Sequence, residues 1–302
     1  MRKSVHLSIV LLLTLSLALS LAGCSLFART PAAGIPEDKI SIVATIFPQY
    51  DFARAIVGDK ADLAMLVSPG ADIHSYDPSP ADIIKIKDSD VFIYVGGESE
   101  VWVDTILSSM DTSGMKLVRL MDSITPVEEE IVEGMQEDEH EHGSEGKEEH
   151  EGEGHEDEEK HGDEKDHEED PEYDEHIWTS PKNAVLMINA IAEAICGADP
   201  DNAAAYRQNA AAYVEDVEKL DKEIREIVDA AGKKLVVFGD RFPFRYFTDE
   251  FGLEYRAAFN GCSTESEASA ATIARLSKPV KENGLSHVFY IELSNQNIAR
   301  SI

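Results

Sequence analysis

Basic residues are scarce in this chain: its 302 residues include 27 Lys and Arg against 59 Asp and Glu, which gives a formal net charge of −32. Nucleic acids carry a dense negative charge, and the proteins that bind them neutralise it with Lys and Arg. The acidic excess therefore argues against a nucleic-acid partner.

Cysteine is also scarce, since the chain has only three. One of them, Cys24, belongs to the N-terminal segment described below, which leaves Cys196 and Cys262. Outside the cytoplasm these two could form a disulfide bond. Two unpaired thiols are an equally good interpretation, and the sequence does not decide between them.

Two common catalytic motifs are missing. The chain has no His-Glu-x-x-His run and no Gly-x-Ser-x-Gly turn. A zinc hydrolase uses the first to hold its metal and place a general base, and a serine hydrolase uses the second to expose its nucleophile. We therefore expect a protein that is not an enzyme and has no catalytic residue.

A long apolar run is present only at the N-terminus, where Val5 to Ala22 follows Met1-Arg2-Lys3. A short basic segment before an apolar run predicts a secretion signal, although the run is also long enough for a membrane-spanning helix. The run ends in Leu21-Ala22-Gly23-Cys24, and small residues before a cysteine resemble the lipobox of bacterial lipoproteins.

The lipobox resemblance implies that cleavage leaves Cys24 as a lipid-bearing N-terminus. We expect a signal peptide over residues 1–23 and a tether over 24–39. Acyl chains such as palmitate would then attach the protein to the extracytoplasmic face of the bacterial cell membrane. An ordinary signal peptide with an incidental cysteine is the alternative.

The stretch from Glu128 to Glu175 concentrates the acidic charge. It contains 26 Asp and Glu, three Lys and no Arg, together with six of the ten histidines. Because the stretch has so few apolar residues, we expect it to be a disordered insertion. Imidazoles among carboxylates indicate weak binding of cations such as zinc. The alternative is a charged segment that is merely solvated. The histidines of this expected low-affinity metal loop are His140, His142, His150, His155, His161 and His167.

Strand and helix patterns alternate along residues 40–120. Short apolar runs rich in β-branched residues predict buried strands, and proline in a first helical turn marks the helices between them. This alternation predicts an α/β fold of parallel strands covered by helices. The expected strands span 40–45, 61–67, 91–95 and 116–120, and the expected helices begin near Pro48, Pro80 and Val101.

Two histidines outside the acidic stretch lie where a metal could bind. His74 is in the polar, proline-rich loop 68–80 after the second strand, and ligands of parallel sheets lie beyond the carboxyl ends of the strands. His176 lies just before a helix for which Ser180 is a natural cap and Pro181 a natural first residue. A surface histidine is the alternative for each.

The C-terminal third begins with a long helix over 203–230, in which apolar residues recur at three- and four-residue steps. Strands over 234–238 and 285–291 and a helix over 266–282 follow in the sequence pattern. These elements predict a second, smaller α/β lobe.

Several of these motifs occur together in one known family. Gly70-Ala71-Asp72-Ile73-His74 and His176-Ile177-Trp178 resemble the zinc-binding type of metal-uptake lipoproteins, the substrate-binding receptors of bacterial ABC transporters. The resemblance covers Ile40 to the end of the chain and implies two lobes joined by one long rigid helix. It also implies that Zn²⁺ is the transported ligand and an ABC permease the partner, and we expect a monomer.

The resemblance divides the chain and suggests its ligands. It implies an N-terminal metal-binding lobe over 40–199, a connecting helix over 200–231 and a C-terminal lobe over 232–302. By the same resemblance His74 and His176 are metal ligands, and Glu292, after the strand 285–291, is the opposing carboxylate.

The third ligand stays open, because many relatives have a histidine where this chain has Gly239. Asp240, Cys262 and Glu265 are candidates by their chemistry. Family members continue beyond Ile302 with another strand and helix, so the resemblance implies either a truncated chain or an unusually small second lobe. A segment beyond Ile302 could hold the ligand. A manganese receptor and a surface adhesin of the same fold are the alternative functions.

Overall fold

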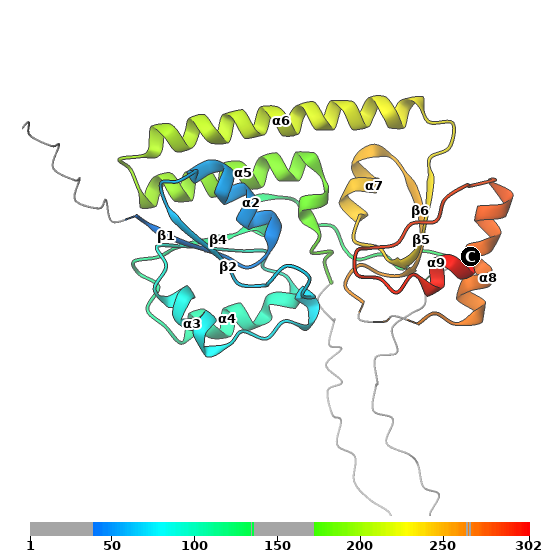
Figure 1. The fold of residues 1–302 in the computed structure, drawn as a ribbon, viewed down its shortest axis with the longest axis horizontal. Helices are drawn as coiled ribbons and strands as arrows, with labels where there is room; N and C mark the ends of the chain where they lie inside the picture. The colour runs from blue at the N-terminus through cyan, green and yellow to red at the C-terminus, as the bar shows by residue number, and fades with distance from the viewer. Residues whose placement is uncertain (1–38, 134, 136–171, 264, 266) are drawn as a thin grey trace, which may run out of the picture. The chain divides into compact units, whose positions relative to one another are not determined.

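The computed structural model describes residues 39–133, 135, 172–263, 265 and 267–302. Its first lobe is built around a sheet of four short parallel strands. Figure 1 shows how the helices and strands are arranged. The strand order is β2-β1-β3-β4. In the register, Ile42 pairs with both Leu63 and Val91, and Val91 also pairs with Lys116. The four predicted strands are confirmed as β1 (Ser41–Ala44), β2 (Asp62–Met65), β3 (Val91–Tyr94) and β4 (Lys116–Arg119).

Helices cover both faces of this sheet, because successive residues of a strand point to opposite sides. Ile42 and Ala44 of β1 pack in a core with α2, α5 and α6, whereas Val43 packs on the other face with α3 and α4. A parallel sheet buried on both faces confirms the expected α/β class. The covering helices are α2 (Phe47–Val57), α3 (Pro80–Lys87), α4 (Val101–Ser108), α5 (Pro181–Ala198) and α6 (Ala203–Ala230).

Helix α5 begins where the sequence predicts, with Ser180 as its cap. The Ser180 hydroxyl accepts a hydrogen bond of 3.1 Å from the backbone N–H of Asn183, and Pro181 is the first residue of α5. A serine at this position satisfies an N–H group that has no partner within the helix, and proline loses nothing at the first turn. These two residues therefore set the direction in which the chain leaves His176.

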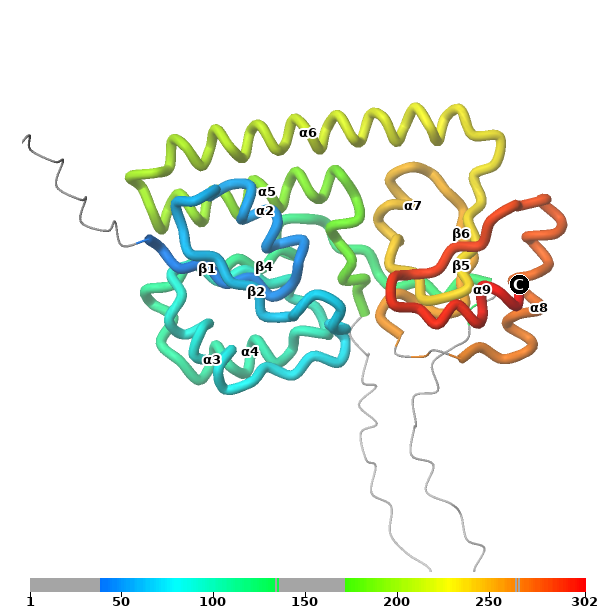
Figure 2. Tube along the Cα trace, viewed as in Figure 1, coloured from blue at the N-terminus to red at the C-terminus, as the bar shows by residue number. Residues whose placement is uncertain are grey.

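Helix α6 has the bounds that the sequence predicts and runs along both lobes (Figure 2). In its first half, Tyr213 donates a hydrogen bond of 2.8 Å to Asp51 of α2. Near its end, Arg225 donates one of 2.6 Å to Glu250 of the second lobe. The two lobes are thus attached to the same helix.

The second lobe contains two parallel strands, β5 (Leu235–Arg241) and β6 (Glu254–Phe259). Phe238 and Tyr255 pack on one side of this pair, and Val237 and Phe259 on the other. Neither β6 nor the helix before it is among the predicted elements. The helices of this lobe are α7 (Arg245–Phe251), α8 (Ala270–Glu282) and α9 (Asn297–Ser301).

Two predicted elements of the second lobe differ from the structure. The strand expected over 285–291 is reduced to one parallel bridge, in which the N–H of Phe289 donates to Val237 and the N–H of Gly239 donates to Phe289. The helix expected from Ser266 begins at Ala270 instead, because the Ser269 hydroxyl accepts from the N–H of Thr272 and caps it.

The insertion is shorter than the sequence predicts, because both ends of the acidic stretch belong to the fold. Glu128 and Tyr173 form an antiparallel bridge, and Met135 is buried beside Phe238. Apolar residues near the ends and backbone pairing are enough to hold them despite the surrounding charge. The six loop histidines fall within 136–171 and lie outside the described residues, as do the signal peptide and Cys24.

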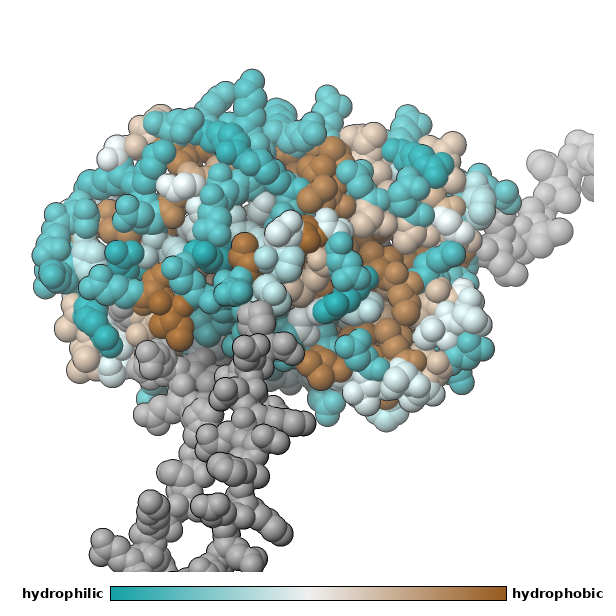
Figure 3. All heavy atoms as spheres, turned by 180° about the vertical axis from the view of Figure 1, so that it is seen from behind, coloured by the Kyte–Doolittle hydropathy of each residue, from teal (hydrophilic) through white to brown (hydrophobic). Residues whose placement is uncertain are grey.

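The two remaining cysteines are free: Cys196 is buried in α5 and Cys262 follows β6. The possible disulfide between them is therefore not formed. On the face drawn in Figure 3, hydrophilic residues surround separate hydrophobic patches, as is normal for a protein surface. In the part of the chain that the structure describes, every helix is too short or too polar to span a bilayer.

Candidate metal centre

His74 lies in a short 3-10 helix, Ile73–Ser75, beyond the carboxyl end of β2. The Asp72 carboxylate caps this helix by accepting a hydrogen bond of 3.1 Å from the N–H of His74. The Nδ1 atom of the imidazole is 2.7 Å from the hydroxyl of Ser99. Because this contact occupies Nδ1, Nε2 is the nitrogen that can bind a metal.

His176 is buried where the chain leaves the acidic stretch. Asp174 accepts a hydrogen bond of 2.8 Å from the N–H of His176, and the same oxygen is 3.2 Å from Nδ1 of the ring. A carboxylate on one ring nitrogen orients the other as a ligand. The ring centroids of His74 and His176 are 5.5 Å apart, so the two rings that the sequence singled out lie side by side.

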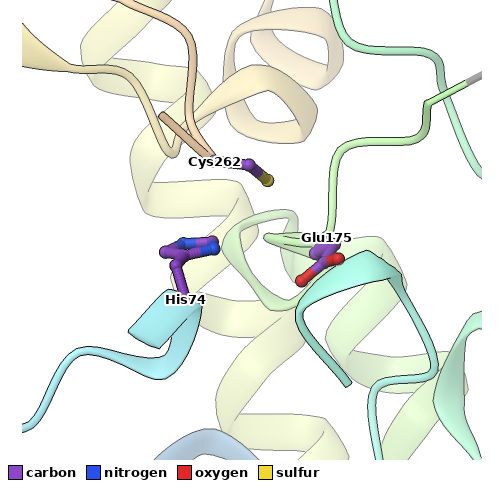
Figure 4. Close-up of side chains that lie close together, drawn as sticks. All are labelled: His74, Glu175 and Cys262. Atoms are coloured by element: carbon purple, nitrogen blue, oxygen red, sulfur yellow. The ribbon is translucent and has the colours of Figure 1, made fainter. Parts of the chain in front are cut away.

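A carboxylate and a thiol join the first of these histidines. Ligand atoms of His74, Glu175 and Cys262 all lie within 4.8 Å of one another. Figure 4 shows these three side chains, which lie close together. His74 and Glu175 come from the first lobe, and Cys262 comes from the second. Imidazole, carboxylate and thiolate are the three donor types that zinc accepts.

The position of Glu175 depends on Gly97. The backbone N–H of Ser99 donates a hydrogen bond of 2.6 Å to Oε1 of Glu175, which fixes the carboxylate. A Cβ atom at Gly97 would lie 2.4 Å from Cγ of Glu175, so only glycine leaves room for this side chain. Glu175 is not among the ligands predicted from the sequence, because its place in the acidic stretch assigns it to the insertion. Its adjacency to His176 is the signal that could have found it.

Cys262 is held by a carboxylate from the other end of the acidic stretch. Glu129 accepts hydrogen bonds of 3.1 Å from the N–H of Cys262 and 2.6 Å from the side-chain amide of Asn260. Burial, followed by the neighbouring charges of Glu129 and Glu175, raises the pKa of the Cys262 thiol well above its usual range. Burial also raises the pKa of Glu129 and of Glu175.

His74 is shifted in the opposite direction. Burial first, and then the neighbouring His176, lower the pKa of His74 from 6.5 to about 4. Above about pH 4 the imidazole of His74 is therefore neutral, and the neutral form has the free lone pair that a metal ligand needs.

The other predicted ligands line a cleft of about 690 Å³ that both lobes form and that His74 and His176 also line. Glu292 lies on this cleft with an exposed side chain, outside the group of converging ligand atoms among the described residues. Asp240 and Glu265 line the cleft as well, and Asp240 accepts a hydrogen bond from the N–H of Arg241. The role of each as a ligand stays a prediction.

Gly239, where relatives were expected to have a histidine, has no room for a side chain. A Cβ atom there would lie 2.5 Å from Cα of Ala299 in α9. The close packing of α9 on β5 therefore closes that ligand position.

Arg241 connects the two sides of the cleft. Its guanidinium donates hydrogen bonds of 3.1 Å to Asp72, which caps the helix of His74, and of 3.1 Å to the carbonyl of Ser263, next to Cys262. One side chain thus ties the loop of the first-lobe histidine to the turn of the second-lobe thiol.

A family model and individual known proteins both match this chain. The family ZnuA, described as zinc-uptake complex component A, periplasmic, matches residues 42–302. The high-affinity zinc uptake system protein ZnuA of Bacillus subtilis (strain 168) is 30% identical over 284 residues, which are 94% of this chain and 81% of that protein.

A second relative is longer than this chain. The zinc-binding lipoprotein AdcA of Streptococcus pneumoniae is 30% identical over 268 residues, which are 88% of this chain and 48% of AdcA, so the chain spans about half of its length. The crystal structure of the Zn(II)-bound ZnuA-like domain of that AdcA matches with a TM-score of 0.63 at 27% identity, covering 87% of this chain and 82% of that one.

The Gly97→Ala substitution should weaken binding of Zn²⁺ at this centre, because the added methyl group would displace the Glu175 carboxylate. We expect a loss of affinity of about tenfold or more, or about 1.4 kcal/mol, measured by competition with a chelating indicator at one equivalent of zinc. Gly114→Ala is the matched control, since a Cβ atom there meets nothing within 4 Å. Equal affinity of the two variants would contradict the role of Glu175.

The lowered pKa of His74 should make the stability of the chelator-treated protein depend on pH. Between pH 6.5 and about 4 the unfolded chain binds a proton at His74 that the folded protein does not, so the free energy of unfolding should fall as the pH falls through this range. Denaturant titrations should show a smaller fall for His74→Asn. His287→Asn, which changes an exposed histidine, should behave like the unsubstituted protein; an identical pH profile for all three would refute the assignment.

Proposed function

Because this chain belongs to the ZnuA family of zinc-uptake components, we propose that it is an extracytoplasmic receptor that binds Zn²⁺ and delivers it to an ABC-type membrane permease. The observation that carries the proposal is the pair of imidazole rings 5.5 Å apart, each with one nitrogen occupied by a polar partner and the other available. Such a pair, on a cleft between two lobes, fits capture of an ion better than catalysis.

The proposed ligands of the first lobe are His74, His176 and Glu175. Zinc prefers four ligands in a tetrahedron, with nitrogen atoms at about 2.0–2.1 Å. The free nitrogens of the two rings and the fixed carboxylate would supply three of them. Glu292 is the carboxylate that the family resemblance puts forward from the second lobe, and its place on the same cleft keeps it as a candidate.

Ligands from both lobes would make binding and lobe position depend on each other. An ion bound between the lobes 40–199 and 232–302 would favour the arrangement of the two lobes in which donors from both of them reach the ion. A permease that contacts both lobes could then distinguish the loaded receptor from the empty one. The long helix over 200–231 would limit the difference to a small tilt.

Zinc fits the donor set better than manganese. Manganese favours carboxylate and carbonyl oxygen, whereas the two imidazoles suit zinc. No described feature of the surface favours the adhesin alternative.

We also propose how the receptor is presented to its permease. Acyl chains on Cys24 would anchor it to the outer side of the cell membrane, and the segment 24–39 would act as the tether. We propose that it works as a monomer and without enzymatic activity.

The ligand assignment predicts the effect of removing both imidazoles. His74→Ala with His176→Ala should lower the affinity for the first equivalent of Zn²⁺ by about a thousandfold or more, since two of the proposed ligands are lost. Isothermal titration in competition with a chelator would measure it, with His287→Ala as the control. Wild-type affinity in the double variant would rule out the proposed site.

The histidines of the acidic stretch predict a separate class of weak sites. Removing residues 136–171, and joining the ends with a short flexible linker, should leave the tight site intact and abolish the weak binding of further zinc equivalents. The deletion must spare Glu129, Asp174 and Glu175, which contact the site or belong to it. Loss of the tight site in this variant would show that the two classes are not separate.

A further inference from the structure

Cys262 has surroundings unlike those of the other free cysteine in the described part of the chain. Cys196 is buried in the helical core and donates its S–H to the carbonyl of Ala203, as a structural thiol does. Cys262 instead lies among His74, Glu175 and Glu129. A thiol surrounded by an imidazole and carboxylates is placed for chemistry with a cation rather than for packing.

The backbone on both sides of Cys262 is fixed. Glu129 accepts the hydrogen bond from the N–H of Cys262, and Arg241 donates to the carbonyl of the next residue, Ser263. On the other side, a Cβ atom at Gly261 would lie 3.1 Å from Nδ1 of His176 and 3.0 Å from the carbonyl of Phe242, so glycine lets the turn approach the imidazole closely. These contacts hold the thiol at the centre before any ion arrives.

The other second-lobe candidates, Asp240, Glu265 and Glu292, line the cleft but do not belong to the converging group of ligand atoms among the described residues. Gly239 is closed by α9, and Glu292 is exposed at the cleft. Among the described residues, Cys262 is the one second-lobe member of the group whose ligand atoms converge. A tetrahedral zinc site separates its ligand atoms by about 3.5 Å, so movements of about 1 Å would bring the atoms of this group to binding distance.

We propose that Cys262 is the metal ligand of the second lobe and acts with His74 and Glu175, whose ligand atoms converge with its own. His176 lies outside that converging group, but its ring is beside that of His74 and would complete the set. This proposal rests on the proposed function for the identity of the ion. On binding, the thiol releases its proton to solvent as the metal–sulfur bond forms, and no electron is transferred. The thiolate makes the receptor selective for zinc and other thiophilic divalent cations over manganese.

Cobalt(II) tests the proposal in the full-length protein, because a thiolate bound to cobalt gives a charge-transfer band in the near ultraviolet. One equivalent of Co²⁺ should produce this band in the unsubstituted chain, and Cys262→Ser should abolish it. Cys196→Ser and Cys24→Ser are the matched controls and should keep it. A band that survives in Cys262→Ser would overturn the proposal.

Measured affinities for Zn²⁺ and Mn²⁺ distinguish the proposal for Cys262 from the proposed receptor function on which it rests. Cys262→Ser should weaken binding of Zn²⁺ by about tenfold or more and change binding of Mn²⁺ much less. If Cys262→Ser binds zinc normally while His74→Ala and Glu292→Gln do not, the thiol proposal fails and the receptor proposal stands. If His74→Ala also binds zinc normally, both fail.

X-ray absorption at the zinc edge needs no substitution and is independent of how the variants fold. With one equivalent of zinc bound, the unsubstituted protein should show one sulfur neighbour at about 2.3 Å together with nitrogen and oxygen neighbours. A shell of nitrogen and oxygen alone would overturn the proposal.

Discussion

Desolvation of the donor groups is the constraint on which the metal centre depends. Glu175 and His176 are 3% and 6% exposed, and charged groups are costly in such surroundings unless they are paired. Burial accordingly raises the pKa of Glu175 and Cys262 and lowers that of His74, so that each group favours its neutral form. A divalent cation bound here would reverse this preference for the two acids, and ion binding would then be coupled to proton release.

Polar contacts from distant parts of the chain keep these donors in place. Ser99 fixes both His74 and Glu175, Asp174 orients His176, and Glu129 holds the turn of Cys262. Glu129 and Asp174 come from opposite ends of the acidic stretch, which pair through the bridge between Glu128 and Tyr173. The ends of that stretch are therefore structural supports of the centre, whatever role its histidines have.

Several features of the fold could be predicted from the sequence because they depend on neighbouring residues. Buried strands such as Val91–Tyr94 are short apolar runs, and the helix Ala203–Ala230 has a regular apolar period, so both are visible without the structure. The helix over 270–282 begins later than the sequence pattern indicates, because Ser269 is the serine that caps it. The segment at Phe289 is apolar enough for a strand, but its pairing with β5 depends on a partner far away in the chain.

The sequence by itself determined the two candidate histidine ligands and the α/β class of the fold, because residue type and short-range pattern carry that information. It marked His74 and His176, although 102 positions separate them, by the motifs around them. Only the tertiary structure decided which donors meet: it brought Glu175 out of an apparent charge run, placed Cys262 beside it, and left Glu292 exposed. The reason is that convergence depends on how two lobes pack across a cleft, through close approaches such as that of Gly97 to Glu175, which local patterns do not encode.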